Sequence, residues 1–199
     1  MLLQVVDLFK SYSQNVLFNR YSEQFESPRL CLAAPNGFGK STLLAILAGL
    51  EPLQSGEVRV NAKRCSPEQL QKQVALASDK LLFPEFLSAQ ELLSLTEKYC
   101  QTHPVQPLVD ALVFAPFLST KVADLSSGNL KKLQLINAFM RDVSVLLLDE
   151  PTAALEQKSI PVLLELIANF KGQIILTSHE PQVFIQAGFS LKELTREEC

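Results

Sequence analysis

The chain has 199 residues, with a hydrophobic fraction of 47% and a charged fraction of 20%. These values predict a soluble globular protein of one domain, or of one domain with a small inserted lobe, and they exclude a disordered chain. The formal net charge is −3, and the Lys and Arg residues are scattered. A nucleic-acid binder needs a concentrated basic face, so no nucleic-acid partner is expected.

The cysteines and histidines do not form a metal-binding motif. No two of the four cysteines have the spacing of a zinc site, so free thiols in a reducing compartment are expected. No apolar stretch reaches the roughly 20 residues that span a bilayer, and the start of the chain lacks the basic lead of a signal peptide. A membrane role would therefore need a membrane part supplied by another chain.

The first third of the chain is typical of strands that lead into a turn and a helix. Strands are predicted over Leu2–Phe9, Val16–Phe25, Leu30–Ala34, Glu57–Val60 and Val74–Ala77. Helices are predicted over Ser41–Leu50, after the turn at 35–39, and over Pro67–Gln73.

Prolines separate short helical pieces between residues 80 and 140, which predicts a helical lobe inserted into the sheet domain. Further on, Val143–Leu148 and Ile174–Thr177 are apolar runs of the kind that form buried parallel strands, and Ile160–Phe170 is a predicted helix between them. Strands that alternate with helices favour an α/β fold with a parallel sheet covered on both faces. We expect a core of about 1–79 and 141–199, with a helical subdomain of about 80–140.

A phosphate-binding loop is predicted between a strand and a helix. The N-terminus of a helix presents unpaired N–H groups, and small residues let the backbone wrap around phosphate oxygens. Lys40 can reach the β and γ phosphates of ATP, and the Ser41 hydroxyl can bind Mg²⁺. Ala34 stands where the strict motif has Gly, and its single methyl group is compatible with the loop. The predicted ATP-binding residues here are Ala34, Pro35, Asn36, Gly37, Phe38, Gly39, Lys40, Ser41 and Thr42.

Two carboxylates follow the apolar run Val143–Leu148, at the end where parallel sheets place ligands. Asp149 is expected to hold Mg²⁺ through water, and Glu150 to act as the general base that polarises the attacking water. His179 follows the next apolar strand. A histidine at such a position, taken alone, would be interpreted as a surface or helix-capping residue. Because His179 accompanies the phosphate loop and the two carboxylates, we favour the interpretation that it contacts the γ-phosphate.

These motifs, in this order, resemble the nucleotide-binding domain of ABC transporters over nearly the whole chain. The most specific is Leu125–Asn129 (LSSGN), which is similar to the family signature LSGGQ. From the residues alone, the same segment is a loop and N-cap before a helix over Leu130–Met140. The resemblance implies a P-loop NTPase core of parallel strands, with N-terminal antiparallel strands and an inserted helical subdomain.

The resemblance also implies roles for individual residues. Tyr12 stands where the family carries an aromatic residue that stacks on adenine. The residues of the signature loop, which act on the ATP of a partner subunit, are Ser126, Ser127, Gly128 and Asn129.

Besides Ala34 in the phosphate loop, and Asn129 in place of the signature Gln, the sequence departs from the family pattern at three residues. Ser127 replaces a Gly of the signature, and Glu156 replaces an Asp that follows the Asp149–Glu150 motif in the family. Asp79 stands where the family has a Gln that senses Mg²⁺ and couples to the membrane subunit; it could bind Mg²⁺ but would repel phosphate. The residues that carry the chemistry are all present, so we expect hydrolysis, either slow or assisted by a stronger partner subunit.

The resemblance implies a catalytic ATPase subunit that uses ATP and Mg²⁺ at the inner face of the cell membrane. Its partners would be a second ATPase subunit, identical or different, and transmembrane permease subunits. The short segment after His179 leaves no room for the regulatory domain of many import subunits, so the layout is similar to the haem-exporter (cytochrome c maturation) branch.

Two alternatives stay open at this point. One is a subunit that binds ATP and hydrolyses it weakly or not at all. The other is a soluble ABC-type ATPase of DNA repair, chromosome organisation or translation. The chain lacks the long coiled-coil insertion of the chromosome type and has room for only one of the two domains of the translation type.

Overall fold

The computed structural model describes residues 2–194. The predicted free thiol Cys199 lies outside the described residues, as does the end of the predicted core. Within them, Cys31, Cys65 and Cys100 are free. Burial, followed by the nearby charge of Glu150, raises the pKa of Cys31 to about 11, so this thiol stays protonated and unreactive.

Two β-sheets form the frame of the described chain. An antiparallel sheet has the order β2-β1-β4-β5, with strands β1 (Leu3–Tyr12), β2 (Asn15–Phe25), β4 (Ser55–Val60) and β5 (Lys63–Arg64). A parallel sheet has the order β6-β7-β8-β3-β9, with strands β3 (Arg29–Ala33), β6 (Val74–Ala77), β7 (Val145–Asp149), β8 (Gln173–Thr177) and β9 (Ser190–Glu193). This arrangement confirms the predicted α/β fold with N-terminal antiparallel strands.

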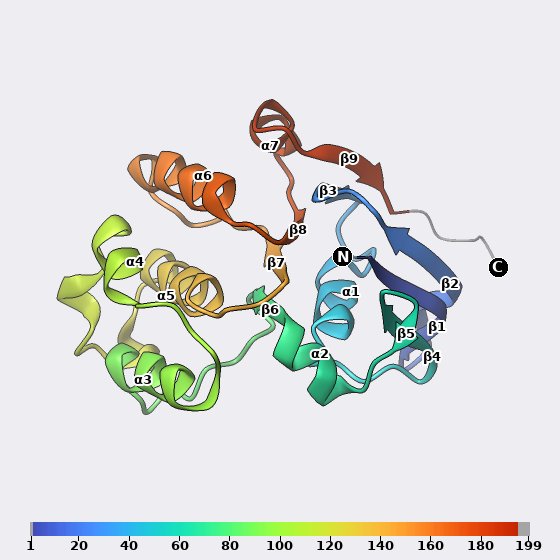
Figure 1. The fold of residues 1–199 in the computed structure, drawn as a ribbon, viewed down its shortest axis with the longest axis horizontal. Coiled ribbons are helices and arrows are strands. Elements are labelled where there is room, and N and C mark those ends of the chain that lie inside the picture. The colour runs from blue at the N-terminus through green and yellow to red at the C-terminus, as the bar shows by residue number, and fades with distance from the viewer. Residues whose placement is uncertain (1, 195–199) are drawn as a thin grey trace.

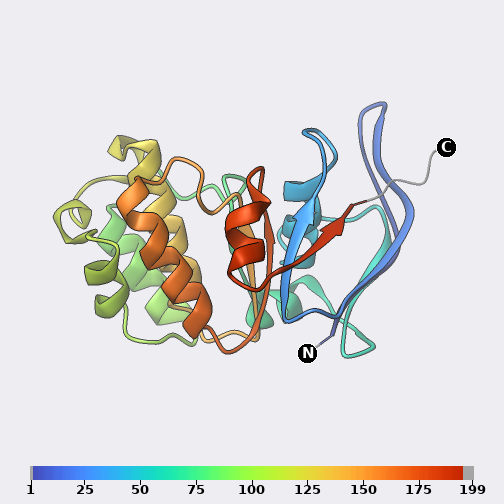
Figure 2. The same ribbon diagram turned by 90° about the horizontal axis from the view of Figure 1, so that it is seen from above.

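Helices cover both sides of the parallel sheet. They are α1 (Lys40–Leu47), α2 (Pro67–Gln73), α3 (Ala89–Tyr99), α4 (Gln106–Ala111), α5 (Ser127–Phe139), α6 (Ile160–Asn169) and α7 (Pro181–Gln186). Figures 1 and 2 both place α3 to α6 on one side of the strands and α1 on the other. The chain forms α3, α4 and α5 between β6 and β7. The division into core and subdomain at 79 and 141 stays a prediction.

The first four residues of the buried strand β7 are apolar and contribute side chains to two hydrophobic cores. Successive side chains on a strand point to opposite faces of the sheet. Leu146 and Leu148 therefore pack into the core formed with α3 to α6, whereas Val145 and Leu147 pack into the core formed with α1 and the antiparallel sheet. No helix within residues 2–194 has the length and apolar character needed to cross a membrane.

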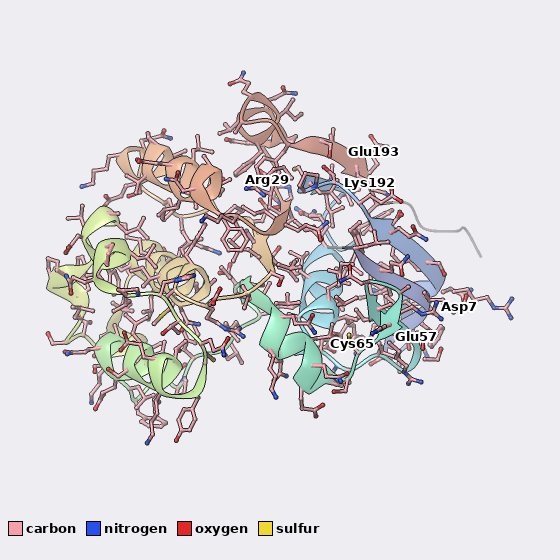
Figure 3. All side chains as sticks on the ribbon, in the orientation of Figure 1. Asp7, Arg29, Glu57, Cys65, Lys192 and Glu193 are labelled. Atoms are coloured by element: carbon pink, nitrogen blue, oxygen red, sulfur yellow. The ribbon has the colours of Figure 1, made fainter. Side chains whose placement is uncertain are left out.

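Arg29, at the start of β3, ties the end of α6 to the sheet. Its guanidinium, labelled in Figure 3, donates to the carbonyl oxygen of Gly172 at 2.6 Å and also to that of Phe170. Carbonyls at the end of a helix have no partner within it, and a cation suits the negative end of the helix dipole. This contact fixes α6 beside the strands that carry the site.

The antiparallel sheet depends on a close backbone approach at Gly56. This residue has φ +95°, and a Cβ atom placed on it would lie 2.5 Å from the carbonyl oxygen of Asp7 on β1. Gly188 has a similar φ of +89°, but apart from its two chain neighbours no described residue has an atom within 4 Å of its Cβ position. The two glycines therefore separate the cost of backbone conformation from the cost of crowding.

We expect Gly56→Ala to destabilise the protein by roughly 3 kcal/mol or more, because a steric clash adds to the backbone strain. The matched variant Gly188→Ala should lose only about 1–2 kcal/mol, which is the cost of the left-handed region for an L-residue. Urea denaturation of both variants measures the two losses. Equal losses would contradict the close approach of β1 to Gly56.

Candidate functional site

The phosphate loop joins β3 to α1. Gly39 is the N-cap of α1 with φ 93°, and no side chain caps the helix, so the N–H groups of its first turn are open to an anion. The Lys40 side chain is 8% exposed, and its Nζ donates to the carbonyl oxygens of Ala34 at 2.6 Å and Pro35 at 3.4 Å. A cation held by neutral carbonyls can exchange them for phosphate oxygens.

Asp149 ends β7 at the edge of the parallel sheet beside this loop. Its two carboxylate oxygens accept hydrogen bonds from the hydroxyls of Ser78 and Thr177, both at 2.7 Å. The residue is 6% exposed. These two hydrogen bonds fix the orientation of the Asp149 carboxylate.

Glu150 follows in a left-handed backbone conformation, with φ 46°. Its backbone N–H donates to Thr177 Oγ1 at 3.1 Å, which holds the turn against β8. The carboxylate faces His179: Oε2 accepts the backbone N–H of His179 at 3.0 Å, and Oε1 lies 3.4 Å from Nε2 of the ring. A non-glycine residue with positive φ is a strained position that a functional site can retain.

One pocket of about 330 Å³ collects most of the predicted nucleotide-binding residues. Its predicted members are Tyr12, Asn36, Gly37, Phe38, Gly39, Lys40, Ser41, Thr42, Asp149, Glu150 and His179. Ala34 and Pro35 do not line it, and they contribute the carbonyls that hold Lys40. Leu17 and Lys80 line it without having been predicted.

Tyr12, at the end of β1, forms the outer wall of the pocket. Its hydroxyl donates to Glu51 at 2.7 Å, and the Nζ atoms of Lys10 and Lys80 lie 4.7 and 5.6 Å from the ring centroid. Burial, and next the hydrogen bond to Glu51, raises the pKa of the Tyr12 phenol, so the ring stays neutral. An aromatic face that attracts cations can also stack on a base.

Asp79, the residue predicted as a further Mg²⁺ ligand, does not line the pocket. Its side chain is 78% exposed and pairs with Lys131 of α5, whose Nζ lies 2.8 Å from Oδ1. The next residue turns toward the pocket instead: Lys80 Nζ donates to Thr42 Oγ1 at 2.8 Å. Both residues lie beyond the end of β6, where no strand alternation indicates which side chain faces the pocket.

The signature loop lies at the N-terminus of α5. This helix begins at Ser127, and the predicted start at Leu130 is wrong because Ser126 caps it by accepting the backbone N–H of Asn129 at 3.2 Å. Ser126, Gly128 and Asn129 line a second pocket of about 290 Å³. Ser127 does not line this pocket. Other members include Lys132, Glu156 and Lys158.

The two pockets share no lining residue. Figure 1 places α1 and α5 on opposite sides of β6 and β7. Lys132 and Lys158 lie 3.8 and 3.0 Å from Glu156 in the second pocket, which gives it excess positive charge beside a helix N-terminus. The described chain therefore has two separate sites suited to phosphate.

Comparison with known proteins agrees with this geometry. A family model described as ABC transporter matches residues 23–153, a range that holds the phosphate loop, both carboxylates and the signature loop. The ATP-binding protein Uup of Escherichia coli K12 is 30% identical over 175 residues. That alignment covers 88% of this chain but 26% of Uup, so the chain spans about a quarter of that relative's length.

Solved structures share the fold. An ATP-binding subunit of an ABC transporter has a TM-score of 0.84 at 25% identity, with 98% of this chain and 86% of that chain covered. A dimeric ATP-binding cassette in a post-hydrolysis state, bound to ADP and phosphate, has a TM-score of 0.79 at 20% identity, with 98% and 97% covered. With its family match over 23–153, the chain belongs to the ABC transporter family, as one of its ATP-binding and ATP-hydrolysing domains.

Proposed function

We propose that this chain powers an ABC-type membrane transporter as one of two ATPase subunits that share their nucleotides. The observation that carries the proposal is the 330 Å³ pocket, where Lys40, Ser41, Asp149, Glu150 and His179 meet. They come from the ends of β7 and β8 and the start of α1, where open α/β sheets bind ligands. A γ-phosphate in this pocket would lie among a cation, a carboxylate base and an imidazole.

The proposed chemistry uses the residues as they are placed. Lys40 exchanges the carbonyls of Ala34 and Pro35 for the β and γ phosphates, while the open N–H groups of α1 bind further phosphate oxygens. Glu150 accepts a proton from the attacking water as general base. Its contact with His179 orients the imidazole toward the same place, which supports the predicted γ-phosphate contact.

Ser41 and Asp149 fit the predicted Mg²⁺ site, because both line the pocket and both present oxygen, the ligand type that Mg²⁺ prefers. Both Asp149 oxygens already accept hydroxyl hydrogen bonds, which suits a contact through water. When bound, Mg²⁺ neutralises charge on the phosphates.

The dimer is inferred from the separation of the two pockets. The signature loop and the phosphate loop of one chain lie on opposite sides of β6 and β7, so a second subunit must bring its signature loop to this chain's ATP. The dimeric cassette of the same fold supports this arrangement. ATP would favour the closed dimer because only the closed state contacts it from both sides.

The permease partner is assigned to the loop between β6 and α3. Leu82 and Phe86 in this loop are 87% and 75% exposed, and exposed large apolar side chains mark protein contacts. The loop begins at Ser78, and its third residue, Lys80, lines the nucleotide pocket, so the loop can relay the nucleotide state to a membrane subunit. A permease subunit docked on this loop would hold the chain at the membrane, and the inner face is the side that the proposed transporter role implies. The haem-exporter branch stays a prediction.

Light scattering on the Glu150→Gln variant tests the shared site. We expect a monomer without ATP and a dimer with ATP, because the variant keeps the nucleotide from being hydrolysed. A matched double variant that adds Ser126→Asp should stay monomeric, since Asp still caps α5 but repels a phosphate. A Glu150→Gln variant that binds ATP and stays monomeric would overturn the shared site.

A further inference from the structure

Three consecutive residues after β6 each reach a different part of the site. The Ser78 hydroxyl donates to Asp149 at 2.7 Å, and Asp79 pairs with Lys131 of α5 at 2.8 Å. Lys80 donates from Nζ to Thr42 Oγ1 at 2.8 Å, in the first turn of α1. This short segment therefore joins the carboxylate strand, the signature helix and the phosphate loop.

Like Lys40 in the same pocket, Lys80 has no carboxylate partner at ion-pair distance within residues 2–194, whereas three other lysines of this region do. Lys10 pairs with Glu51, Lys131 with Asp79, and Lys132 with Glu156. The close contacts of its Nζ atom are a neutral hydroxyl and the ring of Tyr12, 5.6 Å away. Its charge also acts at longer range on the Glu51 carboxylate, which forms its ion pair with Lys10. Lys80 and Lys40 both line the nucleotide pocket, so two positive charges are available to a bound nucleotide.

We propose that Lys80 is a second cationic ligand for the phosphates of a nucleoside phosphate, and that it exchanges the Thr42 hydroxyl for a phosphate oxygen when the nucleotide binds. This proposal rests on the proposed function. A phosphate oxygen is the stronger partner, because a hydrogen bond between two ionised groups is roughly twice as strong as one between neutral groups.

The position of Lys80 indicates where along the nucleotide it acts. It lies between Thr42, in the first turn of the phosphate-binding helix, and Tyr12, the residue assigned to adenine. We call the side of the pocket formed by Tyr12 the base wall. A cation between the phosphate loop and this base wall would contact the phosphates nearest the ribose. Its movement would also pull on the neighbouring Asp79 and, through Lys131, on α5.

Calorimetric titration of the Lys80→Met variant with adenosine, AMP, ADP and ATP tests the proposal. Met keeps the length of the side chain and removes the charge. We expect unchanged affinity for adenosine and a roughly ten- to hundredfold loss for the nucleotides that carry the contacted phosphate. The first nucleotide in the series to show the loss identifies that phosphate, and Lys80→Arg should restore most of the affinity.

The matched control is Lys98→Met, because Lys98 is also an exposed lysine over a tyrosine ring, 5.4 Å from the centroid of Tyr99, but lies on α3 outside the pocket. It should bind all four ligands like the wild type. An equal loss for adenosine and ATP would overturn the proposal and assign Lys80 to the base wall, and no loss for any ligand would also overturn it. Failure of the wild type itself to bind ATP would overturn the proposed function instead.

Discussion

Replacing Glu150 with Gln is expected to lower the rate of ATP hydrolysis by roughly 10² to 10⁴, the contribution of a positioned general base. Gln keeps the shape of the side chain but cannot accept the proton of the attacking water. The affinity for ATP should stay near that of the wild type, because Lys40 and the N-terminus of α1 are unchanged. Steady-state phosphate release and equilibrium ATP binding measure the two quantities.

A matched control is Glu165→Gln, which removes the same charge from an exposed position of α6 outside the pocket. This variant should hydrolyse ATP at the wild-type rate. If Glu150→Gln hydrolysed ATP as fast as the control, Glu150 would not be the base. If it failed to bind ATP, its charge would serve to build the site rather than to move a proton.

Replacing Lys40 with Met is expected to weaken ATP binding by about a hundredfold or more. Each charge-assisted hydrogen bond contributes about 1.5–3 kcal/mol, and Lys40 is placed to make such bonds to both the β and γ phosphates. Adenosine, which has no phosphate, should bind the variant as it binds the wild type. Calorimetry measures the affinities, and the rise in melting temperature on adding ATP should shrink in parallel.

Lys72→Met controls for loss of a lysine, because Lys72 is exposed in the last turn of α2 and outside the pocket. The melting temperature without nucleotide checks the fold, since Lys40 also holds the carbonyls of Ala34 and Pro35. ATP affinity within twofold of the wild type for Lys40→Met would contradict the assignment of the phosphate loop.

The sequence by itself determined the elements whose signals are local. Helix α2 begins at Pro67 because Ser66 and Gln69 form a reciprocal capping box and proline fits the first turn. The stretch 145–148 of β7 is apolar at each of its four positions, which favours burial on both faces of a sheet. The phosphate loop is likewise a pattern of consecutive residues, and the motifs follow one another in a recognisable order along the chain. The fold class could therefore be predicted from the sequence.

The sequence predicted the first and last residues of the helices and strands less well than it predicted their existence. Helix α5 begins at Ser127 rather than Leu130, since the hydroxyl of Ser126 supplies the cap and the helix extends through the signature loop. Strand β9 was not predicted, and it exists because its backbone pairs with β3 at the edge of the parallel sheet. Pairing between segments far apart in sequence leaves no local pattern.

Only the tertiary structure decided which side chains meet in the site. Glu150 and His179 are in contact because β7 and β8 are neighbours in the sheet, a fact that neither strand's own sequence contains. Lys80 rather than Asp79 lines the nucleotide pocket because the buried Lys131 of α5 holds the Asp79 carboxylate outward. The spacing of apolar residues follows from local backbone geometry, so the sequence indicates which face of a helix or strand is buried. The direction of a loop side chain depends instead on the charges that tertiary packing brings beside it.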